Sequence, residues 1–254
     1  SCGDMMGIPH HQDHLANCFV SARKGLKEGK GNLVTSWAVR HNHPELGHPA
    51  TFAAVYAKTN RRAYNEREIY EAFTLEYYGV NLPDFIEAAA KAQKGFRFAE
   101  RRGIEEAFQK LQQKEDPVPS LIENLVVQFK GIENARTYFA NTIADYQSAY
   151  SIIEDMKSKV LKNTRNLDFW LEGIALQQFY AEFILKALQG NLAMNSLQLL
   201  NRLNHLRENT IQLFSETYMP NGLMKEVELR YGFFVKYLLI LELYENQLSV
   251  IHRS

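Results

Sequence analysis

The sequence predicts a mainly α-helical protein, in which a helical bundle follows a short head with one clear strand. From about residue 60 onward, apolar side chains recur at steps of three, four or seven, which is the period of one helix face. Before residue 60 the composition differs, because six of the eight histidines lie there among glycine- and proline-containing turns. We therefore predict two regions, residues 1–60 and residues 61–254, and we expect the first to be largely non-helical.

The composition is that of a globular chain, with 46% hydrophobic residues to form a core. Twenty-nine basic residues balance 29 acidic ones without a long run of either sign, so neither nucleic acid nor an anionic membrane is indicated as a partner. The most apolar run, residues 233–244, includes Lys236 and Glu242 and is too short for a bilayer span, which needs roughly 20 apolar residues. We predict no transmembrane segment.

The low cysteine content favours a reducing, cytoplasmic location. Two cysteines, Cys2 and Cys18, are too few for the disulfide framework of a small secreted protein. The chain opens on Ser1, and neither a basic stretch nor an apolar stretch of signal-peptide type follows. We expect the sequence to begin within a longer protein.

Helix signals occupy most of the chain after the head. A break at residues 116–119 is followed by Ser120 and Glu123, a capping-box spacing that predicts a helix start at Ser120. Before this break, the sequence predicts helices at residues 51–58, 65–78, 82–93 and 104–114.

The strongest periodicity predicts one long helix between residues 132 and 160. Its proposed inner stripe is Ile132, Ala135, Phe139, Ile143, Tyr146, Tyr150, Ile153 and Val160. Three further helices, residues 169–188, 197–214 and 222–251, would pack against it as an antiparallel bundle. The residues of the last helix expected to face inward are Leu223, Val227, Tyr231, Phe234, Leu238, Leu241 and Leu248. Trp170, Phe179 and Phe183 are predicted core residues.

Residues 32–39 in the head are short, β-branched and preceded by glycine, which is typical of a buried strand. Trp37 lies near the end of this strand, and a polar loop with Arg40 and Glu45 follows it. An indole face can cover the C–H groups of a pyranose while a guanidinium and a carboxylate bind its hydroxyls. The same residue types also fit a core tryptophan beside a structural Arg–Glu pair, so both interpretations stay open on this pattern.

The histidines suggest a metal site as a rival interpretation. His10 and His14 are four residues apart, and His41, His43 and His48 could complete a shell. No acidic residue completes an HExxH pattern, however, and we favour six surface or loop histidines without a metal. No cofactor is predicted.

The head resembles family-20 glycoside hydrolases, the β-N-acetylhexosaminidases, and is most similar to the branch related to hexosaminidase D. The residues that carry the resemblance lie within 9–58 and comprise 13–18, 31–40, 44–46, 49 and 53–57. In that family the segment around the tryptophan is the last strand of a (β/α)8 barrel, and a helical region follows. The resemblance therefore implies that residues 1–60 are the C-terminal end of an incomplete barrel and that residues 61–254 are a helical C-terminal domain.

The resemblance also implies the site residues. Trp37 would lie at the base of the subsite for an N-acetylhexosamine, and Glu45 would bind sugar hydroxyls with Arg40 beside it. The family's acid and its acetamido-orienting aspartate form an adjacent Asp-Glu pair, but no Asp in this chain is followed by Glu. A barrel needs about 250 residues, so the expected partners are the remainder of the barrel or a second subunit, and an N-acetylhexosamine-containing glycan. We predict no catalytic residue and no hexosaminidase activity for this chain alone.

Two other classes remain open from the sequence. One is a free-standing helical protein-interaction module whose head keeps an ancestral strand, and the other is a histidine metal-binding protein. A barrel fragment would have unpaired strand edges that a module would cover, and a metal assay would test the histidines.

Overall fold

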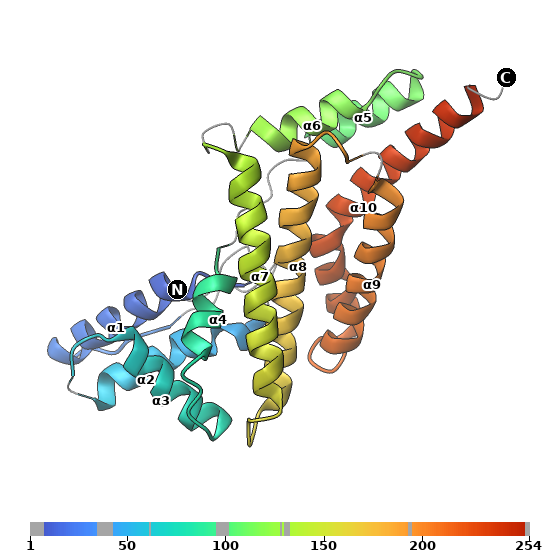
Figure 1. The fold of residues 1–254 in the computed structure, drawn as a ribbon. Helices are drawn as coiled ribbons and strands as arrows, with labels where there is room; N and C mark the ends of the chain where they lie inside the picture. The colour runs from blue at the N-terminus through green and yellow to red at the C-terminus, as the bar shows by residue number, and fades with distance from the viewer. Residues whose placement is uncertain are drawn as a thin grey trace. The chain divides into compact units, whose positions relative to one another are not determined.

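The fold is known from a computed structural model (Figure 1), which describes residues 8–34, 43–60, 62–94, 102–127, 129, 133–192 and 195–251. Over these ranges the regular elements are helices and no strand is present. The elements in chain order are α1 (His11–Lys27), the 3-10 helix η1 (Pro44–Gly47), α2 (His48–Thr59), α3 (Glu66–Tyr78), α4 (Phe85–Ala92), α5 (Arg102–Gln112), α6 (Val118–Val127), α7 (Ala135–Lys157), α8 (Thr164–Leu188), α9 (Ser196–Phe214) and α10 (Pro220–Ile251). The predicted mainly helical fold class is confirmed over the part of the chain that is described.

The chain groups into two compact units, and both are discontinuous in sequence. The first unit comprises residues 1–97 and 144–177, and the second comprises residues 98–143 and 178–254. Helices α7 and α8 are each divided between the two units, at residues 143/144 and 177/178. The change in sequence character near residue 60 therefore falls inside the first unit.

The starts of α1 and α2 lie together in the first unit. His11, the first residue of α1, stacks on Trp170 of α8 with ring centroids 4.8 Å apart. His43, which precedes η1 and α2, stacks on the adjacent Phe169 with ring centroids 3.6 Å apart. Because the two histidines stack on consecutive residues of α8, the start of α1 and the start of α2 are close in space.

The ends of α1 and α2 also lie together, so the two helices run in the same direction. Near the end of α1, Arg23 donates from Nη2 to the backbone carbonyls of Asn60 and Arg62, just beyond the end of α2. The helices pack directly against each other, and Figure 1 shows them side by side.

Helix α3 carries the aromatic core of the first unit. Asn65 caps its start by accepting a hydrogen bond from the Glu68 N–H, and its end has Gly79 at φ +78°, a left-handed conformation that suits glycine. Buried rings from α3, α4 and α8 meet edge to face or tilted. They are Tyr70, Phe73, Tyr78, Phe85 and Trp170.

The second unit is built around the antiparallel pair α9 and α10. Thr210 is hydrogen-bonded to the Tyr231 hydroxyl at 2.5 Å, and Ser196 donates to Glu245 at 3.1 Å, so rising numbers on one helix meet falling numbers on the other. The inner stripe predicted for the last helix is confirmed by the burial of Leu223, Val227, Tyr231, Phe234, Leu238 and Leu241, while the side chain of Leu248 lies outside the described set. The predicted core residues Trp170, Phe179 and Phe183 are also buried.

Three predictions need correction or qualification. The head is not largely non-helical, since α1 and α2 fill much of it. Helix α6 starts at Val118, where Asp116 accepts a hydrogen bond from the Val118 N–H at 2.9 Å, so the helix does not start at Ser120. Residues 35–42 of the predicted strand region lie outside the described ranges, and residues 31–34 have no regular structure.

The inner stripe of α7 is also shifted from the prediction. Tyr150 is 39% exposed, and Thr142 and Ala149 are buried beside Phe139 and Tyr146. The buried positions thus follow alternating steps of three and four, which keep one face of the helix inward.

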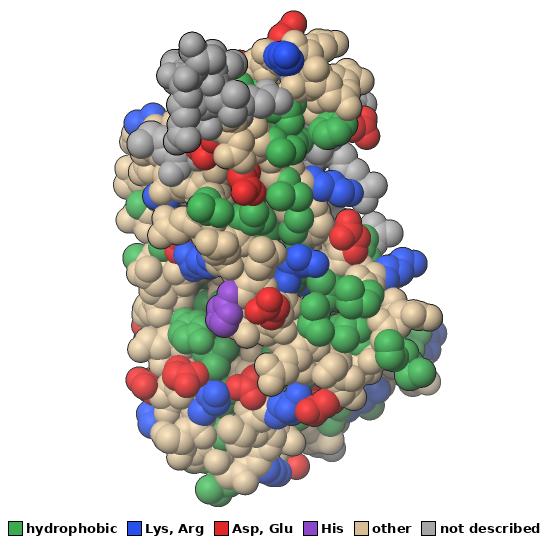
Figure 2. Space-filling model, turned by 90° about the vertical axis from the view of Figure 1, so that its right-hand side faces the viewer, with side chains coloured by type: hydrophobic (Ala, Val, Ile, Leu, Met, Phe, Trp, Pro, Cys, Tyr) green, Lys and Arg blue, Asp and Glu red, His purple; other side chains and the backbone are tan. Residues whose placement is uncertain are grey.

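The face of the molecule drawn in Figure 2 is mixed in charge. Figure 2 shows acidic and basic side chains interspersed with small apolar areas, as the balanced composition predicts. Within the described ranges no helix is both long and apolar enough to cross a membrane.

Candidate functional site

Of the three predicted sugar-binding residues, the structure places Glu45. Trp37 and Arg40 belong to residues 35–42 and lie outside the described ranges. Glu45 is in η1, immediately before α2, and its side chain is 35% exposed. A carboxylate in this position is partly shielded but still reachable by a ligand.

Local sequence explains how Glu45 is presented. Pro44 provides the fixed φ angle that suits the start of a helical turn. His43 caps η1, because its Nδ1 accepts a hydrogen bond from the Glu45 N–H at 3.3 Å. The His43 ring is in turn held against Phe169, so the backbone at Glu45 is fixed from α8.

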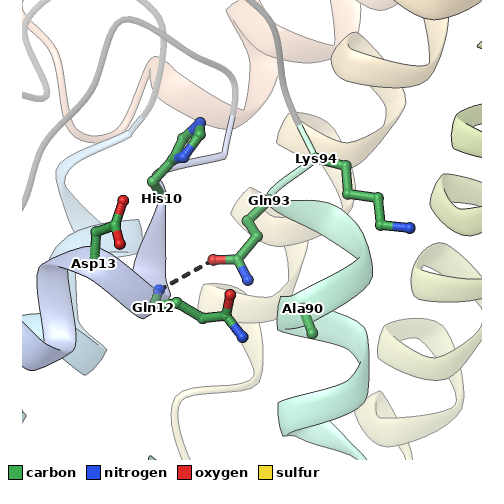
Figure 3. Close-up of a pocket in the computed structure, with 6 residues that line it drawn as sticks. All are labelled: His10, Gln12, Asp13, Ala90, Gln93 and Lys94. Atoms are coloured by element: carbon green, nitrogen blue, oxygen red, sulfur yellow. Dashed lines mark hydrogen bonds between the residues drawn. The ribbon is translucent and has the colours of Figure 1, made fainter. Parts of the chain in front are cut away.

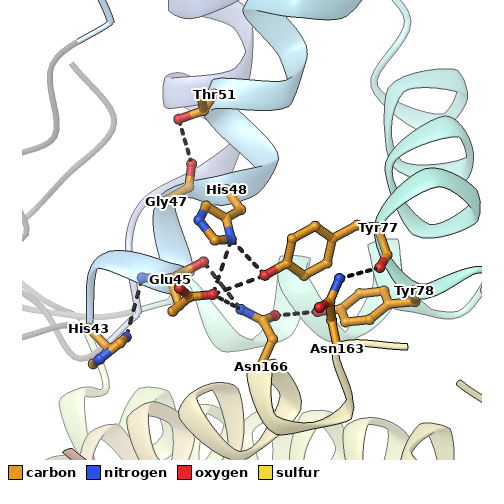
Figure 4. Close-up of polar contacts among 9 residues, drawn as sticks. All are labelled: His43, Glu45, Gly47, His48, Thr51, Tyr77, Tyr78, Asn163 and Asn166. Atoms are coloured by element: carbon orange, nitrogen blue, oxygen red, sulfur yellow. Dashed lines mark hydrogen bonds and ion pairs between the residues drawn. The ribbon is translucent and has the colours of Figure 1, made fainter. Parts of the chain in front are cut away.

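One oxygen of the Glu45 carboxylate lies at the centre of a polar cluster (Figure 4). Oε2 accepts a hydrogen bond from the Tyr77 hydroxyl at 2.9 Å and one from Asn166 Nδ2 at 3.3 Å. His48 Nδ1 lies 3.3 Å from the same oxygen. Oε1 has no hydrogen bond to any described residue. We call Glu45, His48, Tyr77, Tyr78 and Asn166 the Glu45 cluster.

The donors of the Glu45 cluster are themselves held. Tyr78, which is fully buried, donates its hydroxyl proton to Asn166 Oδ1, and this orients the amide so that Nδ2 faces Glu45. Asn163 Nδ2 donates to the backbone carbonyl of Tyr77 at 2.6 Å, which fixes the end of α3 beside the start of α8. Tyr77 therefore contacts Glu45 directly, whereas Tyr78 acts on Glu45 through Asn166.

The hydroxyl of Tyr77 determines which groups donate and which accept in the Glu45 cluster. It has one proton, which it donates to Glu45, and its oxygen lies 2.8 Å from His48 Nδ1. His48 must then donate from Nδ1 to Tyr77. Burial raises the pKa of Tyr77 above its ordinary value, and the hydrogen bond to Glu45 and the negative charge of that residue raise it further. Tyr77 therefore stays protonated and remains a donor.

A separate pocket of about 260 Å³ lies at the start of α1 (Figure 3). Gln12 and Gln93 close one side of it, because the Gln12 N–H donates to Gln93 Oε1 at 3.0 Å. Lys94 at its rim forms an ion pair with Asp145. The pocket is lined by His10, Gln12, Asp13, Ala90, Gln93 and Lys94. This mixed polar lining suits a small polar group rather than an apolar one.

The histidines do not form a metal site in the described part of the chain, where no three His, Cys, Asp or Glu side chains lie close enough to share an ion. His41 lies outside the described ranges. The prediction that the six head histidines are surface or loop residues is wrong for His11, which is buried within α1 against Trp170. His43 lies in the loop before η1, as that prediction allows, but its ring is buried against Phe169. A signal for His11 was present, since it continues the apolar spacing of Leu15, Cys18 and Ala22.

Tyr77 and Asn166 were not predicted as site residues. They lie 32 and 121 positions after Glu45, and nothing in their local sequence distinguishes them from core or cap residues. No protein-family model matches this chain, and the curated proteins and the solved structures contain no significant match to it.

Proposed function

We propose that this chain is the C-terminal part of a glycoside hydrolase similar to the family-20 β-N-acetylhexosaminidases. Residues 1–60 would form one wall of the subsite for an N-acetylhexosamine, and the helical remainder would support that wall. The observation that carries the proposal is the arrangement of α1 and α2, which pack side by side in the same direction. Successive helices of a (β/α)8 barrel are arranged in this way, with a strand returning between them.

The length of the connection supports this proposal. Helix α1 has 17 residues and is about 25 Å long, at about 1.5 Å per residue. The predicted strand, residues 32–39, would cover about 26 Å at about 3.3 Å per residue. A single strand is therefore the right length to return from the end of α1 to the start of α2.

The position of Glu45 also fits. Active sites of (β/α)8 barrels lie at the carboxyl ends of the strands, which is the end where the following helices start. Glu45 lies at the start of α2, close to the start of α1, so it is at the end where the proposal requires a ligand-binding residue.

The chemistry proposed for this part of the site is binding and orientation. The Trp37 indole would stack on the sugar ring, and Glu45 and Arg40 would bind hydroxyl groups through charge-assisted hydrogen bonds. The proton donor and the acetamido-orienting aspartate would come from the remainder of the barrel. The proposal assigns no catalytic residue to this chain.

Saturation-transfer NMR with N-acetylglucosamine tests the proposal. We expect saturation of the sugar's ring and acetamido protons by the unaltered chain, and its loss in Trp37→Ala. Phe108→Ala serves as the control, because Phe108 is an exposed aromatic residue on α5, outside the head. Equal saturation in the unaltered chain and in Trp37→Ala, or none in either, would contradict the proposal and favour a helical interaction module.

A further inference from the structure

We infer that Tyr77 and Asn166, which come from the helical part of the chain, are positioning residues that hold the Glu45 carboxylate and leave its Oε1 for a sugar hydroxyl. The inference rests on the proposed function, since it concerns the same subsite. It assigns a role to the helical region, which would complete the geometry of a binding residue in the head.

The two oxygens of Glu45 are in different environments. Oε2 accepts hydrogen bonds from Tyr77 at 2.9 Å and Asn166 at 3.3 Å, and His48 Nδ1 lies 3.3 Å from it, whereas Oε1 accepts no hydrogen bond from a described residue. Three contacts on one oxygen restrict rotation of the carboxylate. The other oxygen keeps its lone pairs for an external donor, and a third of the side chain is exposed.

The charge of Glu45 is not matched by a strong cation. Over the described ranges its one ion-pair partner is His48, and no lysine or arginine lies within salt-bridge distance of it. Hydroxyl and amide donors hold the carboxylate instead, so its negative charge remains available. A hydrogen bond from a sugar hydroxyl to such a carboxylate is of the stronger, charge-assisted kind.

Tyr77 and Asn166 are rigid enough to act in this way. The Tyr77 ring stacks on Phe73, with centroids 5.1 Å apart and planes within 16°. Asn166 is buried and accepts a hydrogen bond from Tyr78, so its amide cannot turn without breaking that bond. Donors fixed by a packed core position a ligand-binding group better than donors on a free surface.

Tyr77→Phe tests the inference with little risk to the fold, because it removes one hydroxyl and keeps the ring on Phe73. We expect the Kd for N-acetylglucosamine to rise about tenfold, the change that loss of one useful hydrogen bond produces. Tyr70→Phe is the matched control on the same helix, since the Tyr70 hydroxyl makes no hydrogen bond to a described residue. The control should bind N-acetylglucosamine as the unaltered chain does.

The 4-deoxy and 6-deoxy analogues of N-acetylglucosamine separate positioning from general damage. The analogue that lacks the hydroxyl bound by Glu45 should bind Tyr77→Phe and the unaltered chain equally. If Tyr77→Phe binds N-acetylglucosamine normally, or loses affinity for the sugar and both analogues alike, the positioning role is overturned while the sugar site stands. If the unaltered chain binds none of the three sugars, the proposed function is overturned and the positioning role with it.

Discussion

The imidazole of His11 lies nearly parallel to the indole of Trp170, with ring centroids 4.8 Å apart and an angle of 21° between the planes. His11 is only 1% exposed, and neither of its ring nitrogens has a hydrogen-bond partner in the described part of the chain. Burial lowers the pKa of His11 to about 3, and His14 and His10 act in the same direction. The packed core of the first unit therefore accepts this histidine only in its neutral form.

The first prediction is a loss of stability in acid that depends on His11. The unfolded chain binds a proton at this residue below about pH 6.5, whereas the folded chain does not until the pH falls to about 3. The contribution of His11 to the free energy of unfolding should be constant above pH 6.5. It should fall by up to about 1.4 kcal/mol per pH unit as the pH decreases from 6.5 to 3.

Urea unfolding of the unaltered chain and of His11→Leu at pH 7, 5 and 4 measures this contribution. The two free energies of unfolding should converge or cross as the pH falls, because leucine does not titrate. His205→Leu, on the exposed side of α9, controls for the removal of a histidine as such. The same pH dependence in His11→Leu as in the unaltered chain would show that His11 is not buried as a neutral ring.

The second prediction concerns the end of α3. Gly79 has φ +78°, and a Cβ at this position would come 3.2 Å from Leu161 Cβ. Gly79→Ala should lower the free energy of unfolding by about 1–2 kcal/mol, because an L-residue is strained in this conformation and the contact is tight. The thermal midpoint should fall accordingly.

Gly222→Ala is the matched comparison for Gly79→Ala. Gly222 lies in α10, and a Cβ there would meet nothing within 4 Å. Alanine is the better helix former by about 1 kcal/mol, so this substitution should raise the thermal midpoint or leave it unchanged. Similar shifts in both variants would exclude a specific role for the left-handed conformation at Gly79.

The third prediction tests the hydrogen bond between Tyr77 and Glu45 without a ligand. Glu45→Gln removes the negative charge that raises the pKa of Tyr77, while burial still raises it. The pKa of Tyr77 should therefore move down toward its ordinary value in this variant and stay above it. Carbon NMR of labelled tyrosine rings over an alkaline titration measures the change, and Tyr70 provides the internal reference. An unchanged titration of Tyr77 would mean that its hydroxyl does not donate to Glu45.

The sequence predicted those elements whose signal is local. The inner face of α10 repeats at helical spacing over Leu223, Val227 and Tyr231, so its burial was predictable without knowledge of its neighbours. The stripe of α7 was less well defined, because Thr142 is polar and Ala149 is small although both face inward. A hydrophobicity pattern predicts that the larger Tyr150 is buried in place of these two residues. Tyr150 is exposed instead, because burial depends on which side of the helix packs against its neighbours.

The site depends on contacts that a local pattern does not contain. Glu45 was predicted through a family resemblance, but the donors that hold it come from α3 and α8 and meet it only after folding. His43 shows the same limit, since a histidine before a proline is typical of an exposed turn. Its burial follows from the presence of Phe169 at the facing position of α8.

The last prediction uses the two tryptophans of the chain, Trp37 and Trp170, to test the sugar-platform interpretation. Trp170 is fully buried, so the variant Trp37→Phe, in which only Trp170 fluoresces, should resist quenching by acrylamide. Trp170→Phe leaves Trp37 as the one reporter and keeps an aromatic ring in the core. If Trp37 forms an open face for a pyranose, its emission should be quenched readily, and saturating N-acetylglucosamine should protect it. Emission that is as poorly quenched as that of Trp170, in a variant with an unchanged helical circular dichroism spectrum, would instead make Trp37 a core residue and remove its role in sugar binding.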